Sequence, residues 1–120
     1  MAALNIAFES PDNSRGPSPT RAIDLVHLAK QTMGDKALEV EVLQMFARQA
    51  RSCLQEIGSG DAKRIQAASH KLTGAASAIG AFRVADAAAA LETNTGDAAQ
   101  MAAVTACVIE AENFILKLSR

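Results

Sequence analysis

The sequence predicts an all-α protein: an antiparallel up-down four-helix bundle with an additional short N-terminal helix packed on it. Glycines punctuate segments that are rich in Ala, Leu, Glu, Lys and Gln, the strong helix formers. Within the segments, apolar residues recur at helical spacing, and no alternating β-branched run is present. Because the connections are short, consecutive helices are expected to be antiparallel neighbours.

The expected helices cover residues 21–33, 35–57, 61–79, 81–94 and 97–118. Thr20 is the expected N-cap of the first helix, and Asp35, Asp61 and Asp97 are expected to begin the second, third and fifth. The fourth segment is rich in alanine, so a neighbouring helix can approach its backbone closely. Core positions are expected for Met33, Met45, Met101, Phe46, Phe82 and Phe114.

Composition divides the chain into two parts. All three prolines fall within the first twenty residues, which predicts a flexible N-terminal arm over residues 1–19 and one folded domain over residues 20–120. The formal net charge is −1 and the basic residues are scattered, so neither nucleic acid nor a membrane surface is an expected partner. No segment has the features of a signal sequence or a membrane span, so a cytoplasmic protein is expected. Cys53 and Cys107 have no CxxC motif and are expected to be free thiols.

His70 is the candidate reactive residue. On the third helix Ile65, Ala68, Ser69, Leu72, Ala76 and Ile79 form the apolar stripe that must face the core. At 100° per residue, His70 lies roughly 160° from the centre of that stripe. The imidazole is therefore expected at the middle of the exposed face, with Lys63, Gln66, Thr73, Gly74 and Ser77 around it.

Gly74 is an unusual residue to find beside this histidine. Glycine inside an exposed helix costs about 1 kcal/mol relative to alanine, and here it follows His70 by four residues, where a side chain would stand beside the ring. Thr73 and Ser77 are also short. The ring is expected to protrude from a low surface that another molecule can approach, with a neutral ring nitrogen available as a nucleophile.

The same residues carry a family resemblance. HKLTGAA (residues 70–76) is followed by IGA (79–81) and then by Val84, Ala88, Leu91 and Glu92. This segment resembles the signature of histidine phosphotransfer (HPt) domains. Upstream, IDL (23–25) and Gly34-Asp35 before a long helix are similar to the entry of that family, so the resemblance covers nearly everything after the arm.

The resemblance implies a four-helix bundle whose exposed histidine, His70, carries a phosphoryl group. Such domains take the group from the aspartyl phosphate of one receiver domain and pass it to the aspartate of another, in a relay that begins at a hybrid sensor histidine kinase. The protein is then a relay intermediate and not an enzyme. It needs no cofactor or metal of its own, because the receiver supplies Mg²⁺. A monomer is expected, since one bundle can bury its own apolar faces.

One position departs from the family pattern: Thr73 stands where the family usually has lysine. That lysine is thought to steady the phosphoryl charge or to help dock the receiver. The hypothesis is that Lys63, Lys71 and Arg83 supply the missing positive charge between them.

Two alternatives stay open. The first is an adaptor that kept the bundle, lost phosphotransfer and binds receiver domains. The second is a bundle that holds a metal or haem, which requires inward-facing ligands from several helices. Asp24 and His27 have suitable spacing but no second such pair exists, so His27 is expected to join the first helix to the bundle.

Overall fold

The computed structural model describes residues 21–119 and contains five helices and no strand within that range. The helices are α1 (Leu25–Thr32), α2 (Lys36–Ile57), α3 (Ala62–Ile79), α4 (Phe82–Thr93) and α5 (Ala98–Ser119). The all-α prediction is confirmed, and the four later helices agree with their expected ranges to within one residue at each end. The expected arm, residues 1–19, lies outside the described residues.

Aspartate side chains cap the beginnings of α2, α3 and α5. Asp35 Oδ1 accepts a hydrogen bond from the Leu38 amide, and Asp61 Oδ1 accepts from the amides that follow it. Asp97 Oδ1 likewise accepts from the amides of residues 99 and 100. A short carboxylate in extended backbone satisfies amides that have no partner in the first helical turn, and its charge favours the positive end of the helix dipole.

The first helix starts later than predicted. Asp24, not Thr20, is its N-cap, because Asp24 Oδ1 accepts hydrogen bonds from the amides of Val26 and His27. Residues 21–23 therefore precede the helix. Ile23 is fully buried, so this short stretch contributes to the core instead of adding a turn to α1.

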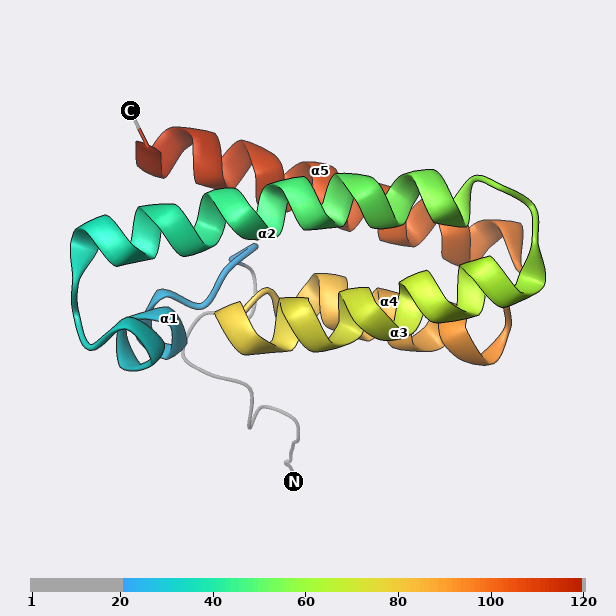
Figure 1. The fold of residues 1–120 in the computed structure, drawn as a ribbon, viewed down its shortest axis with the longest axis horizontal. Helices are drawn as coiled ribbons and strands as arrows, with labels where there is room; N and C mark the ends of the chain where they lie inside the picture. Colours follow the sequence, from blue (N-terminus) through green and yellow to red (C-terminus); the bar gives the residue numbers. More distant parts are fainter. Residues whose placement is uncertain (1–20, 120) are drawn as a thin grey trace, which may run out of the picture.

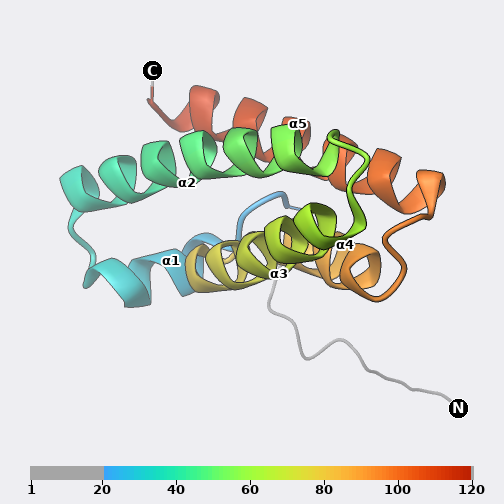
Figure 2. The ribbon, with the colours of Figure 1, turned by 45° about the vertical axis from the view of Figure 1, so that its right-hand side comes forward.

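The four long helices form two layers, with α2 beside α5 in one and α3 beside α4 in the other (Figures 1 and 2). Each of them packs against the next long helix in the chain, and α5 packs against α2. Consecutive long helices run in opposite directions in Figure 1. The short α1 contacts α2 and α3 at one end of this helical bundle. No helix within residues 21–119 combines the length and apolar composition needed to span a membrane.

The core is mainly aliphatic and draws on all five helices. Phe46 is buried, and Met101 and Phe114 pack at its edge. The core prediction is wrong for Met33 and Met45, which are 94% and 59% exposed. Met33 follows α1 in a left-handed conformation that turns it away from the bundle. Met45 stands on the outer side of α2, because Leu43 and Phe46 already occupy the inward positions there.

Both cysteines are free thiols, as predicted: Cys53 is buried and Cys107 is half-buried. Burial raises the pKa of both thiols. Less thiolate is therefore present at neutral pH, and thiolate is the form that reacts with oxidants and metals.

A close backbone contact joins α1 to the turn between α3 and α4. The Asp24 amide donates a 2.9 Å hydrogen bond to the Gly80 carbonyl. Gly80 has φ +87°, and a Cβ there would lie 2.9 Å from the Asp24 carbonyl oxygen, so only glycine fits without movement of the backbone. His27 reinforces the junction, with Nε2 3.1 Å from the Ala78 carbonyl and its ring edge-on to Phe82. The predicted role of His27 is confirmed.

Candidate functional site

Helix α3 separates a buried face from an exposed one. The predicted apolar stripe is buried along its length: Ile65, Ala68, Ser69, Leu72, Ala76 and Ile79. On the other face, the side chain of His70 is 79% exposed. Ser69 and His70 are adjacent in sequence, yet one is fully buried and the other stands in solvent. The helical rotation inferred from sequence thus places the imidazole outside the core.

A carboxylate on the next helix holds the histidine ring. His70 Nδ1 lies 3.0 Å from Oε2 of Glu92 near the end of α4, and the glutamate side chain is 28% exposed. Because a carboxylate can only accept, this contact assigns the proton of the neutral ring to Nδ1. The lone pair then resides on Nε2, at the far side of an exposed ring, as a nucleophile requires.

The surface beside the ring is low. A Cβ built on Gly74 meets no atom within 4 Å, other than the neighbouring helix backbone. The Thr73 hydroxyl donates a 2.8 Å hydrogen bond to the Ser69 carbonyl and so turns back onto its own helix. Ser77 is half-buried one turn beyond Gly74. No packing contact in the described part of the chain therefore requires a glycine at this position.

Two lysines lie toward α2 from the histidine. Lys63 and Lys71 both line a depression of about 330 Å³ between α2 and α3. Arg64, in the same depression, pairs with Glu56 at 2.9 and 3.0 Å, and this pairing lowers the pKa of the Glu56 carboxyl. Within residues 21–119, no carboxylate lies within ion-pair distance of Lys63 or Lys71. Their ammonium groups are therefore available to an outside anion.

Arg83 is directed to another side of the bundle. It forms an ion pair of 3.3 Å with Glu110 on α5. Arg83 and Glu92 are nine residues apart on α4, which puts them on opposite sides of that helix and about 13 Å apart along its axis. Since Glu92 faces His70, the structure does not bring Arg83 to the histidine. Gln66 is exposed on α3, one turn before His70.

Glu92 is the site residue that was not predicted from sequence. In the sequence it is the last position of the motif that begins at His70, and the motif alone does not indicate what its side chain contacts. The available signal was that Glu92 directly follows Leu91. Leu91 is buried where α4 packs onto α3, so the next side chain lies beside that contact. In the part of the chain that the structure describes, no group of three His, Cys, Asp or Glu side chains could hold a metal ion.

Comparison with known proteins agrees with this geometry. The family model for the Hpt domain matches residues 41–114, more than half of the chain, and that range contains both His70 and Glu92. The chain belongs to the Hpt domain family. Hpt domains take part in two-component phosphorelays as intermediates in histidine phosphotransfer. Neither the curated proteins nor the solved structures gave a match.

Gly74→Ala tests whether the glycine is needed for the stability of the fold or for the function of the Hpt site. We expect the substitution to raise the free energy of unfolding by about 1 kcal/mol, because alanine is the better helix former and its methyl group meets open space. We expect the same methyl group to slow phosphoryl transfer from a receiver domain by roughly tenfold or more, because it obstructs approach to the ring. Urea titration and transfer kinetics provide the two measurements.

Gly58→Ala is the matched control. Gly58 caps α2 at a negative φ with room for a Cβ, so its replacement should leave the transfer rate unchanged. A Gly74→Ala variant that is more stable and transfers at the wild-type rate would refute this role for the glycine.

Proposed function

We propose that this protein relays phosphoryl groups between aspartates of receiver domains through a phosphohistidine at His70, within a multistep two-component phosphorelay. The observation that carries the proposal is the exposed imidazole, held through Nδ1 by Glu92 and standing beside the space left by Gly74. Membership of the Hpt family supports the same chemistry. The antiparallel four-helix bundle serves as a rigid mount for this ring.

In the proposed transfer, the Nε2 lone pair of His70 attacks phosphorus in the aspartyl phosphate of a receiver. The bond from phosphorus to the aspartate oxygen breaks, and the receiver's carboxylate leaves with the electron pair. The imidazole keeps its proton on Nδ1 and becomes cationic when Nε2 bonds to phosphorus. Glu92 stabilises that developing positive charge by a charge-assisted hydrogen bond. Transfer onward to a second aspartate reverses these steps.

The remaining chemistry belongs to the partners. In this proposal the receiver domains contribute Mg²⁺ and the acidic pocket, and a hybrid sensor histidine kinase introduces the phosphoryl group. The Hpt protein has no cofactor and no kinase or phosphatase activity of its own, and it works as a cytoplasmic monomer. The single nucleophile on a surface cleared for a partner supports this division of roles.

Replacement of His70 tests the central step. His70→Gln should abolish labelling by a panel of phosphorylated receivers, because the amide has no nucleophilic nitrogen. The wild-type label should be acid-labile and base-stable. His27→Gln is the control, since His27 contacts the Ala78 carbonyl at the α1 junction, and a folded His27→Gln protein should label normally. A wild-type protein that binds receivers and never becomes labelled would favour the adaptor alternative.

Replacement of Glu92 tests how the ring is held. Glu92→Ala should slow transfer by roughly tenfold, since a hydrogen bond to a charged group contributes about 1.5 kcal/mol or more. The ¹⁵N shifts of the neutral imidazole should also move from the Nδ1–H tautomer toward a mixture, a change that a purely structural role would not produce. Glu110→Ala is the control, because Glu110 pairs with Arg83 on the α4–α5 side. An unaltered tautomer in Glu92→Ala would contradict the assignment.

Lys63 and Lys71 are the proposed substitutes for the family's lysine at position 73. The double variant Lys63→Ala, Lys71→Ala should slow transfer severalfold at low salt and make the rate less salt-dependent, as expected for lost electrostatic steering. Adding Thr73→Lys should restore part of the rate. Arg83→Ala should transfer normally, because Arg83 is turned toward α5. Wild-type transfer rates in the double variant would show that the two lysines do not contribute to the site.

A further inference from the structure

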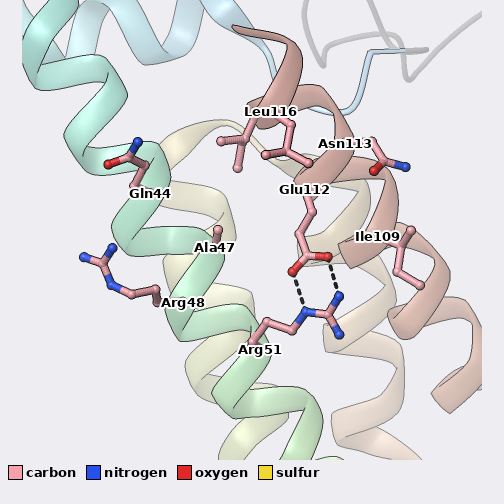
Figure 3. Close-up of a pocket in the computed structure, with 9 residues that line it drawn as sticks. Gln44, Ala47, Arg48, Arg51, Ile109, Glu112, Asn113 and Leu116 are labelled. Carbon is pink, nitrogen blue, oxygen red and sulfur yellow. Dashed lines mark hydrogen bonds and ion pairs between the residues drawn. The ribbon is translucent and has the colours of Figure 1, made fainter. Parts of the chain in front are cut away.

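A groove runs between α2 and α5. It encloses about 590 Å³ and is lined by Gln44, Ala47, Arg48, Arg51, Ile109, Glu112, Asn113, Ile115 and Leu116 (Figure 3). Arg51 and Glu112 connect the two helices with paired hydrogen bonds of 2.6 and 2.8 Å. The phosphotransfer site uses α3 and α4, in the other layer of the bundle (Figure 2). The groove is therefore unexplained by the relay chemistry.

The α5 wall of the groove contains two aliphatic side chains that are open to water, on either side of the polar Glu112 and Asn113. Ile109 is 43% exposed and Leu116 is 63% exposed, although both lie on a helix whose inward face is already filled by Val104, Val108, Ala111 and Ile115. Ile109 and Leu116 are seven residues apart, which aligns them on one side of α5 about 10 Å apart. Water contact at two aligned aliphatic side chains is unfavourable, so a segment that covers both is stabilised by their burial.

The chain itself contains a segment of matching chemistry. Residues 1–8, MAALNIAF, are apolar at every position except Asn5, and they lie outside the described part of the structure. Their apolar side chains, among them Leu4 and Phe8, suit a groove whose wall presents Ile109 and Leu116.

The connecting chain is long enough for this segment to reach the groove. Residues 9–20 join it to the described stretch that precedes α1, which runs between the two helical layers (Figures 1 and 2). Twelve residues span up to ~40 Å when extended and ~19 Å on average as a flexible chain. The whole of α2 is only about 33 Å long. A tether of this length gives an effective concentration in the millimolar range, so even a millimolar intrinsic affinity yields a substantial bound fraction.

Charge favours the same pairing. Arg48 stands on the α2 side of the groove and points away from the Arg51–Glu112 pair (Figure 3). Among residues 21–119, no carboxylate lies within ion-pair distance of Arg48. In the sequence Glu9 follows Phe8 directly, so the apolar segment carries next to it a carboxylate that can pair with Arg48.

We infer that residues 1–8 bind in the groove between α2 and α5, with Leu4 and Phe8 against Ile109 and Leu116 and with Glu9 paired to Arg48. This contact is separate from phosphotransfer and does not involve His70. It makes the segment before Arg21 an intramolecular ligand of the bundle.

NMR on the full chain tests the inference. In the wild type, residues 4–8 should show {¹H}–¹⁵N NOE values well above those of a free chain. Leu116→Gln, on the groove, and the double variant Leu4→Gln, Phe8→Gln should each lower these values toward zero. Both should also shift the methyl resonances of Ile109. Met45→Gln is the matched control: Met45 is 59% exposed on α2 but does not line the groove, so its replacement should change nothing at residues 4–8.

Charge reversal tests the ion pair. Glu9→Arg should lower the NOE values of residues 4–8, and adding Arg48→Glu should restore them. Free-chain values for residues 4–8 in the wild type, or equal values in wild type and Leu116→Gln, would overturn the inference. Groove resonances that shift with protein concentration while residues 1–8 stay unaffected would overturn it too, because a second copy would then be the occupant.

Discussion

The packing of α4 against α3 is the constraint on which the site depends. Helix α4 is rich in alanine, and Ala85 and Ala88, like Ala81 just before the helix, are buried toward the bundle. Small side chains allow two helices to approach closely. At that separation the Glu92 side chain reaches His70 Nδ1 at 3.0 Å without leaving the end of its helix. Larger residues in the same places would move α4 outward and separate the carboxylate from the ring.

The same helix pair explains why the histidine can be both fixed and exposed. A long exposed side chain normally loses rotamer entropy when it is held in one position. Here one hydrogen bond from the neighbouring helix fixes the ring, and the buried stripe of α3 fixes the helix rotation. The other nitrogen stays in solvent because Gly74 adds nothing beside it. Packing between α3 and α4 therefore orients the His70 ring on one side. The lack of a side chain at Gly74 leaves the other side of the ring accessible.

Much of this could be predicted from sequence, because it depends on one helix at a time. Capping by Asp35 and Asp61 follows from the local preference of aspartate for helix starts. The exposure of His70 follows from the 100° rotation per residue and a single apolar stripe. Asp24, not the predicted Thr20, caps α1, and the burial of Ile23 decides where the helix begins. The start of α1 is therefore set by tertiary packing, because it depends on the space between the two layers.

Contacts between helices were the part that sequence could not provide. Glu92 and Arg83 lie on one helix, and either could face α3 until the rotation of α4 is known. Buried Val84, Ala88 and Leu91 set that rotation, which points Glu92 toward His70 and Arg83 toward Glu110. The charge around the histidine is consequently asymmetric, with a carboxylate on the α4 side and two free lysines on the α2 side. A partner that carries a phosphoryl dianion meets attraction from one side and repulsion from the other, so this asymmetry favours one orientation of approach.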